Sequence, residues 1–346
     1  MRKLSFLAVI ATLFMLNPLG SHAQDIHFSQ FYTFSQWLNP ALTANYNGSY
    51  SVTGIYRNQW SGHLSQNSFV TMGAQADFSL FEGQMKHDKF GIGIMVVNDQ
   101  AGEAGFNNLN AAISLAYHRY IGRNDHHSLS LGAQFGYIQK RFDMAKAVFF
   151  DQFDDITYTG ANGTAESLQQ QSFNNFDYNF GIYWRSYFNW RFNLQAGFAL
   201  YHVHEPKESF IQVNNEDYFL AARYVADFGF QVMFNKKFGI APDILFMSQG
   251  PAQEITTGAT FGYYFSSGFR NASSIHFGAR YRIDDAVACL LAVEFRNLRI
   301  GAAYDVNTSS LKTSSTNRGG FEVSLTYIGE SVKSFKAEQS IPCRRF

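Results

Sequence analysis

From about residue 50 onward, apolar and polar side chains alternate with a period of two along most of the chain. This alternation indicates β-strands that have one apolar and one polar face. The segments extend for about nine residues or more, enough to cross a bilayer as tilted strands, whereas strands of soluble sandwiches have about five or six. One segment alternates Leu109, Ala111, Ile113, Leu115 and Tyr117 with Asn110, Ala112, Ser114, Ala116 and His118.

Counting such segments gives about fourteen strands, because the pattern recurs along the whole chain. They are expected at residues 49–60, 67–81, 89–98, 107–121, 127–144, 172–187, 191–203, 217–234, 238–248, 254–265, 273–283, 286–296, 298–306 and 318–328. We therefore expect an all-β fold, a transmembrane antiparallel β-barrel of about 14 strands with short periplasmic turns and longer surface loops.

The lengths of the connections support the barrel independently. If the N-terminus is periplasmic, connections after even-numbered strands should be short turns and those after odd-numbered strands longer loops. Short turns are expected at Asn189, Asn235 and Asn297, and the longest loop, at about residues 145–171, follows the fifth strand. A tight turn at residues 284–285 after the eleventh strand is an exception.

The first 23 residues have the layout of a secretory signal peptide. Arg2 and Lys3 precede an apolar stretch, and Ala23 supplies a small residue before the expected cleavage site. A membrane-anchor helix is the alternative, but the apolar run is too short for it. After Gln24, no stretch approaches the roughly 18 apolar residues of a spanning helix. The mature chain is therefore either a soluble exported protein or a barrel in the outer membrane.

The composition favours the barrel. Aromatic residues make up 17% of the chain, with 36 Phe and 19 Tyr, and charged residues only 16%. A soluble domain of this length would normally carry about 25% charged residues. We therefore expect outer-membrane lipid as the surroundings of the chain. The 27 basic and 27 acidic residues balance, which gives no reason to expect nucleic acid as a partner.

The chain divides into four expected parts. Residues 1–23 form the signal peptide, 24–48 an N-terminal leader without alternation, 49–329 the barrel, and 330–346 a periplasmic tail. The leader either lies in the periplasm or folds into the barrel as a lumen plug. The sequence leaves both places open.

Charged residues of the strands fall on the polar face, which should line the lumen. A charge at mid-bilayer on the lipid face would cost about 2–4 kcal/mol, so this placement supports the topology. The charges could line a channel or hold a plug, but a hydrogen-bonded network that stiffens the wall is favoured. They are Arg57, Asp77, Asp177, Arg185, Arg223, Asp227, Arg280, Arg282, Glu294, Arg296, Asp305 and Glu322.

The long loop at residues 145–171 combines aromatic and acidic residues, a combination that suits a partner-binding surface. These residues are Phe149, Phe150, Asp151, Phe153, Asp154 and Asp155. The three aspartates could instead bind calcium, which prefers oxygen ligands. They lack the fixed spacing and the turn glycine of a calcium loop, so a solvated loop is favoured.

The sequence contains no recognisable catalytic, cofactor-binding or metal-binding motif. It lacks a Gly-x-Ser-x-Gly elbow, a phosphate-binding loop and a His-Glu-x-x-His pattern. His202 and His204 could begin a zinc site, but no third ligand is evident, so interface histidines are favoured. Cys289 should point into lipid, which disfavours a disulfide with Cys343. We expect no enzyme activity, no metal and no cofactor.

The two ends of the mature chain resemble the PorP/SprF family of type IX secretion proteins from Bacteroidetes. The resemblance rests on the motif residues Phe28, Ser29, Gln30, Asn39, Pro40, Ala41, Tyr56, Arg57, Gln59, Trp60 and Cys343. Two positions depart from the family pattern: Ala44 stands where Gly is usual, and Arg344 where Pro is frequent. The second departure puts the contact made by the tail in doubt.

The resemblance implies a non-enzymatic outer-membrane barrel of the type IX secretion and gliding machinery. Such a barrel would dock or help export a specific adhesin-type protein with a type B C-terminal domain. It would also contact the periplasmic ring and peptidoglycan-binding components. The main alternative is a diffusion porin or transporter for small solutes, because about fourteen strands can enclose water. A lipid-modifying enzyme is a third interpretation, which no motif supports.

Overall fold

The computed structural model describes residues 25–59, 69–81, 85, 87–102, 105–122, 125–143, 153–154, 157–158, 172–208, 218–266, 273–309 and 318–330. Strands account for most of these residues. Among them, no helix is both long enough and apolar enough to cross a membrane.

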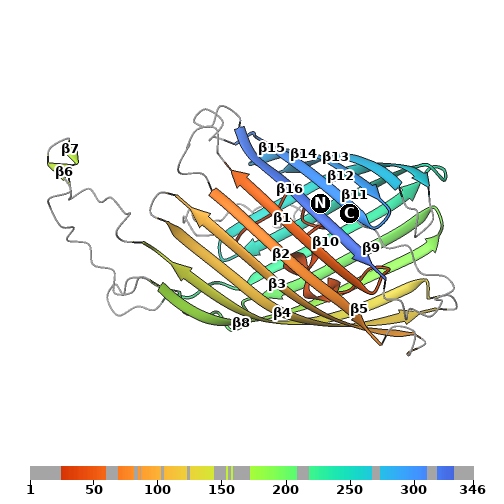
Figure 1. Cartoon of the computed structure of the whole chain (residues 1–346), viewed down its shortest axis with the longest axis horizontal. Helices are drawn as coiled ribbons and strands as arrows, with labels where there is room; N and C mark the ends of the chain where they lie inside the picture. The colour runs from red at the N-terminus through yellow and green to blue at the C-terminus, as the bar shows by residue number, and fades with distance from the viewer. Residues whose placement is uncertain are drawn as a thin grey trace, which may run out of the picture.

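Fourteen strands of the described chain form one closed antiparallel barrel (Figure 1). Each strand pairs with the next barrel strand along the chain, and β1 pairs with β16 to close the ring. The strands are β1 (Tyr50–Gln59), β2 (Phe69–Leu80), β3 (Asp88–Ala101), β4 (Phe106–Ile121), β5 (His127–Arg141), β8 (Ser172–Asn189), β9 (Phe192–Tyr201), β10 (Arg223–Met233), β11 (Phe238–Gln249), β12 (Ala252–Ser266), β13 (Ser273–Arg282), β14 (Ala286–Phe295), β15 (Leu298–Asn307) and β16 (Arg318–Gly329). The expected fold class is confirmed.

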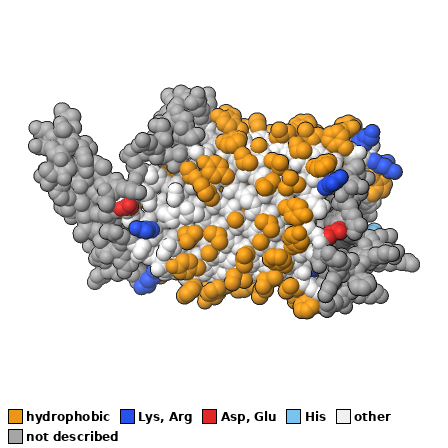
Figure 2. Space-filling view, in the orientation of Figure 1, with side chains coloured by type: hydrophobic (Ala, Val, Ile, Leu, Met, Phe, Trp, Pro, Cys, Tyr) orange, Lys and Arg blue, Asp and Glu red, His pale blue; other side chains and the backbone are white. Residues whose placement is uncertain are grey.

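The two faces of the wall follow from the alternation, because successive side chains of a strand point to opposite sides. In β4, Ile113 and Leu115 are 53% and 57% exposed, whereas Ser114 between them is buried. Exposed apolar side chains from the strands cover the outside of the barrel, as Figure 2 shows for one side. A lipid-facing wall requires such an apolar band.

The two ends of the barrel differ in their connections. At the turn end, β1 begins and β16 ends, and the connections are 81–87, 122–126, 190–191, 234–237, 267–272 and 296–297. At the long-loop end, the connections are 60–68, 102–105, 142–171, 202–222, 250–251, 283–285 and 308–317.

The expected difference in connection length holds only in part. Besides the tight turn at 284–285, the connections at 102–105 and 250–251 are also short although they follow odd-numbered barrel strands. Gly102 and Gly250 have positive φ values of 68° and 55°, which permit tight turns there.

Two local features differ from the sequence-based expectation. The strand expected at 217–234 begins only at Arg223 and ends at Met233, and Leu220 belongs to the β9–β10 connection, where its backbone N–H donates to Pro206 O at 2.9 Å. The long loop at 145–171 contains two short paired strands, β6 (Phe153–Asp154) and β7 (Thr157–Tyr158).

The leader, residues 25–48 as described, lies inside the barrel (Figure 1). It contains one turn of helix, α2 (Ser35–Leu38), followed by a 3₁₀ turn, η1 (Pro40–Leu42). Its buried apolar residues pack against the inner wall in two clusters. One comprises Phe31, Leu38, Ala41, Leu42, Tyr183, Ala199, Tyr201, Val225 and Leu245, and the other Phe28, Phe34, Ile55, Met95 and Val97. The core of the molecule is thus the interface between leader and wall.

Candidate functional site

The leader crosses the lumen from the long-loop end to the turn end. Asp25 lies at the long-loop end, where its backbone N–H donates to Gln249 Oε1 at 2.9 Å at the end of β11. Tyr46 lies at the turn end, where its hydroxyl donates to the carbonyl of Asp77 at 2.8 Å. The chain then enters β1. The leader therefore starts at the long-loop end and ends at the turn end, where β1 begins.

Ser29 is the centre of a buried hydrogen-bond network near the long-loop end. Its backbone N–H donates to Glu322 Oε1 at 2.7 Å, and its hydroxyl donates to Asp305 Oδ1 at 2.6 Å. The same hydroxyl accepts from Arg57 Nη1 at 3.3 Å and from Arg282 Nη2 at 3.2 Å. One leader residue thus contacts side chains of four wall strands.

Arg57 joins the two carboxylates around Ser29. It forms an ion pair with Glu322 and another with Asp305, the latter with Nη2 and Oδ2 3.1 Å apart. All three side chains are at most 3% exposed. Charges buried to this degree need hydrogen bonds as well as an opposite charge. The backbone N–H groups of Ser29 and Gln30 supply such bonds to Glu322. The leader therefore completes the network.

A second arginine binds the leader next to this network. Arg280 makes a two-point ion pair with Asp243, with distances of 2.9 and 3.0 Å. Its guanidinium also lies 4.6 Å from the ring centroid of Phe31 and donates to Ser29 O at 3.3 Å. Because a guanidinium is planar, it can hold a carboxylate and stack on a ring at once.

The Asp25 carboxylate binds two cationic side chains at the long-loop end. His202 Nε2 lies 2.7 Å from Asp25 Oδ2, and Arg223 Nη1 lies 3.3 Å from the same oxygen. The other ring nitrogen of His202 lies 3.0 Å from Asp177 Oδ2. Burial alone would lower the pKa of His202, but the two carboxylates outweigh it and raise this pKa to about 9. The same contacts hold the pKa of Asp25 below its ordinary value despite burial.

The Asn39-Pro40-Ala41 motif fixes the turn in the middle of the leader. The Asn39 side chain accepts from the Ala41 N–H at 2.9 Å and so caps η1, while Pro40 takes the first position of that turn. Asn39 Nδ2 also donates to the backbone carbonyls of Ile182 and Phe198, at 3.1 and 3.2 Å. The motif therefore shapes the leader and binds it to β8 and β9.

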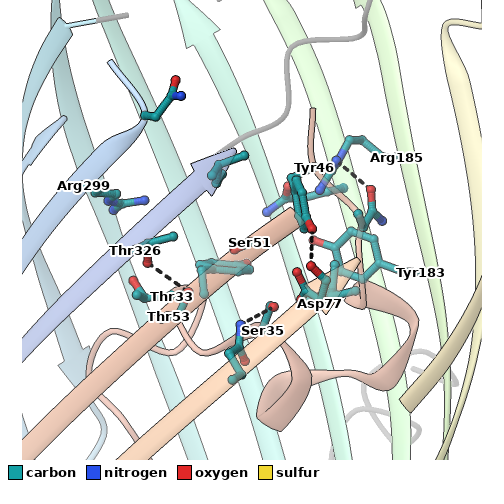
Figure 3. A pocket seen from close by; sticks show the side chains of 17 residues that line it. Thr33, Ser35, Tyr46, Ser51, Thr53, Asp77, Tyr183, Arg185, Arg299 and Thr326 are labelled. Atoms are coloured by element: carbon teal, nitrogen blue, oxygen red, sulfur yellow. Dashed lines mark hydrogen bonds between the residues drawn. The ribbon is translucent and has the colours of Figure 1, made fainter. Parts of the chain in front are cut away.

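Toward the turn end the leader offers only neutral groups to the wall, although charged wall side chains are among their partners. His118 Nε2 lies 2.8 Å from the carbonyl of Thr43, and Arg185 Nη1 donates to Asn45 Oδ1 at 3.1 Å. A cavity of about 90 Å³ lies between leader and wall here (Figure 3). It is much smaller than the roughly 300–1,000 Å³ of typical small-molecule sites. Hydroxyl and amide side chains line much of it, including Thr53, Gln75 and Thr326.

The structure brings seven of the sequence-predicted motif residues together inside the lumen. These are Phe28, Ser29, Gln30, Asn39, Pro40, Ala41 and Arg57, all buried. Tyr56 instead faces outward and is 37% exposed, as the alternation in β1 requires. Gln59 lies at the end of β1, with its side-chain oxygen 3.5 Å from Arg57 Nη2. Trp60 and Cys343 lie outside the described residues.

Eleven of the twelve charged residues expected to face the lumen are buried, among them Arg280, Arg282 and Glu294. The expectation for Arg296 is wrong. This residue lies in the β14–β15 turn with a φ of 55°, is exposed, and has its guanidinium 5.3 Å from the Phe295 ring centroid. The alternation ends where the strand ends, so it does not predict side-chain direction in a turn.

The loop residues expected to bind a partner are largely outside the described part of the chain. Phe149, Phe150, Asp151 and Asp155 lie outside it, and Phe153 and Asp154 form β6. Among described residues, no group of three or more His, Cys, Asp or Glu side chains is placed to hold a metal ion. Cys289 is exposed on the outside of β14.

Sequence reasoning missed several lumen residues that the structure shows to be important. Asp243 and Glu254 stand on inward positions of β11 and β12, so the alternation could have identified them. The pairing of Asp25 with His202 had no such signal, because the two residues are 177 positions apart and neither lies in a barrel strand.

Comparisons with known proteins place the chain in a family. The family model described as "Type IX secretion system membrane protein PorP/SprF" matches residues 20–327. No curated protein matches the chain.

Among solved structures, the Ralstonia pickettii toluene transporter TbuX has a TM-score of 0.53 at 9% identity, covering 86% of this chain and 93% of its own. The Pseudomonas putida toluene transporter TodX has a TM-score of 0.47 at 10% identity, covering 89% and 94%. A FadL homologue from Pseudomonas aeruginosa has a TM-score of 0.48 at 12% identity, covering 84% and 92%. Because the sequence identity to TbuX is only 9%, this likeness shows a shared barrel fold alone. The family match extends over most of the chain, and the protein therefore belongs to the PorP/SprF family of type IX secretion system membrane proteins.

Proposed function

We propose that this protein is a non-enzymatic scaffold in the outer membrane that docks, or helps to export, one specific secreted or surface protein. The observation that carries the proposal is the occupied lumen. The leader crosses it and is bound to the wall by ion pairs of Asp25 near one end and by hydrogen bonds to its uncharged groups near the other. A lumen filled in this way supports a role in holding a partner over a role in passing solutes.

The connections and chain ends support an orientation for this scaffold. Bacterial single-chain barrels keep their short turns in the periplasm, so the turn end, where β1 begins and β16 ends, would face it. The tail, residues 330–346, would then contact the periplasmic ring and peptidoglycan-binding components of the secretion machinery. The long-loop end would face the cell exterior.

The docking surface of the proposal is the long-loop end. Its candidate partner-binding residues are Phe149, Phe150, Asp151, Phe153, Asp154 and Asp155. Described residues of the β9–β10 connection add exposed apolar side chains there: Val203, Tyr218 and Phe219 are 41%, 51% and 54% exposed. Exposed rings rimmed by acids suit a protein partner. The proposed partner is an adhesin-type protein with a type B C-terminal domain.

Deleting the gene and measuring all surface and secreted proteins by quantitative mass spectrometry tests the docking role. We expect one large exported protein to fall strongly at the surface while most others keep their level and location. Complementation with the triple variant F149S/F150S/F153S should fail to restore that protein, although the variant barrel still reaches the outer membrane. If every exported protein keeps its level and place after deletion, the docking proposal is wrong.

Planar bilayers test the closed lumen separately. The purified full-length barrel should show no steady conductance above the empty bilayer, because the leader occupies the lumen. A stable conductance typical of a wide pore would instead support a diffusion porin or transporter for small solutes. This measurement does not depend on the secreted partner, so the two parts of the proposal can fail independently.

A further inference from the structure

Two turns at the turn end share a five-residue sequence pattern, which plays no part in the contacts between leader and wall described above. The β8–β9 turn contains Phe188–Phe192, with the sequence Phe-Asn-Trp-Arg-Phe, and the β10–β11 turn contains Phe234–Phe238, with Phe-Asn-Lys-Lys-Phe. Both place an asparagine after an aromatic residue and a cation before the next aromatic residue. The turns are neighbours, because β9 pairs with β10.

The asparagine makes the same two hydrogen bonds in both turns. Asn189 Oδ1 accepts the backbone N–H groups of Arg191 and Phe192, at 2.8 and 2.9 Å. Asn235 Oδ1 accepts those of Lys237 and Phe238 at the same two distances, 2.8 and 2.9 Å. Such side-chain bonds fix a tight turn. The cation in each turn is thus held at an equivalent position.

Each turn presents apolar rings beside its cations. Phe188 and Trp190 are 54% and 60% exposed, and Phe234 and Phe238 are 60% and 49% exposed. Arg191, Lys236 and Lys237 are exposed as well. The guanidinium of Arg191 lies 4.7 Å from a Trp190 ring centroid. Figure 2 shows basic side chains beside hydrophobic ones at the turn end, on the right.

At the same end, the β14–β15 turn also carries an exposed cation, Arg296, beside Phe295, whereas the connections on the other side of the rim carry paired charges. Near the β2–β3 and β4–β5 connections, Arg119 is paired with Asp88 at 2.7 Å, and His87 lies 2.9 Å from Asp125. The patterned turns, by contrast, contain no acidic residue between positions 186 and 194 or between 234 and 238. The two turns therefore form a locally positive, aromatic sector of the rim.

We propose that this sector binds the headgroups of anionic phospholipids in the leaflet around the turn end. Its rings continue the apolar outer wall, since Phe192 packs on Phe230 of β10 at 6.1 Å between ring centroids. Aromatic rings prefer the boundary between hydrocarbon and water, and Arg and Lys beside them bind phosphate. A lipid reaches this sector without leaving the membrane. An acidic protein would contact the cations but not the rings, which would stay in the membrane. A phospholipid can contact both the cations and the rings.

Native mass spectrometry of the full-length barrel in detergent with added phosphatidylglycerol tests the proposal. The test variant is R191Q/K237Q, which keeps both turn asparagines. The matched control is R119Q/R141Q, which removes two exposed arginines outside the sector. We expect phosphatidylglycerol affinity to fall on the order of fivefold per sector cation removed, with little change in the control. Phosphatidylcholine should bind all three proteins equally weakly.

Equal affinity of wild type and R191Q/K237Q for phosphatidylglycerol would overturn the proposal. So would a loss of the same size in R119Q/R141Q, because net charge alone would then account for binding. A third contrary result is unchanged lipid binding together with loss of a co-purified periplasmic protein, which would assign the sector to a protein. The heat-dependent gel mobility of each variant verifies that the barrel is folded. Removing the rings in W190A/F234A should also weaken binding of phosphatidylglycerol.

Discussion

The long-loop half and the turn half of the lumen hold the same leader by different means. Near the long-loop end, contacts centre on charge: Asp25 binds His202 and Arg223, and Ser29 binds the carboxylates around Arg57. Between Phe28 and Ser49 the leader carries no Asp, Glu, Lys, Arg or His. In the turn half, hydrogen bonds from wall side chains, including the charged Arg185 and Lys89, therefore end on neutral groups of the leader, and no ion pair joins leader and wall among the described residues.

This difference determines what each half should respond to. Buried ion pairs are sensitive to pH and to loss of one partner, because an unpaired charge remains desolvated. Close backbone contacts respond to added volume instead. In the turn half, a Cβ at Gly91 would come within 2.6 Å of Thr43 O, and at Gly93 within 2.7 Å of the Gln36 side chain. The two halves can therefore be perturbed separately.

Arg57→Met should have the largest effect. It leaves Glu322 and Asp305 buried without their main cation, and we expect the barrel to lose about 3–5 kcal/mol of stability. Equilibrium unfolding of the purified barrel in urea measures this. Arg119→Met, which removes an exposed arginine at the turn end, should leave the midpoint unchanged. Equal losses in the two variants would mean that burial of the charge network does not matter.

Loss of the histidine at the long-loop end should make stability less dependent on pH. The pKa of His202 is raised from 6.5 to about 9, so its contribution is fully present below about pH 6.5 and is lost as the pH rises through 9. His202→Gln should cost about 1.5–3 kcal/mol at neutral pH. Unfolding midpoints from pH 6 to 10 provide the measurement. If His202→Gln loses as much stability at alkaline pH as the wild type does, this assignment is wrong.

Gly132→Ala tests the contacts between leader and wall in the turn half of the lumen. The added methyl would overlap the Pro40–Ala41 backbone, so the leader must shift, and we expect a loss of about 1–3 kcal/mol that does not vary with pH. Gly54→Ala is the control, because no atom lies within 4 Å of its Cβ position. Urea unfolding at two pH values would show whether this steric loss is independent of charge.

Tyr46→Phe should have the smallest effect. It removes the hydroxyl that donates to Asp77 O at 2.8 Å, and a neutral hydrogen bond of this kind contributes about 0.5–1.5 kcal/mol. The same urea titration is sensitive enough to detect it. If the loss rivals that of Arg57→Met, the turn half does not depend on many small contacts as we describe.

Much of the wall could be predicted from the sequence, because side-chain direction in a strand follows from geometry alone. The alternation predicted that Arg282 and Glu322 face inward, and both are buried. It failed at Arg296 because the turn residue has left-handed backbone geometry. Knowing that a side chain points inward does not show, however, which residue it will contact. Ser29 and Glu322 are 293 positions apart, and their contact depends on how the barrel closes.

The place of the leader was harder to predict because its residues lack strand alternation. One signal was present: an uncharged stretch between Phe28 and Ser49 that contains many aromatic residues. Such a stretch has little to gain from water and needs an apolar surface to cover it. Which surface it covers could not be read from the sequence, since the inner wall exists only after fourteen strands have paired.

The seam between β1 and β16 has a consequence for the order of assembly. Its strands pair over ten positions, from Tyr50 with Gly329 to Gln59 with Gly320. The packed lumen leaves no room for a segment with aromatic side chains to be threaded through a finished ring. The leader is therefore expected to be in place beside the sheet before β16 pairs with β1. Folding then ends in a single late step that joins contacts far apart in sequence, which are the slowest to form.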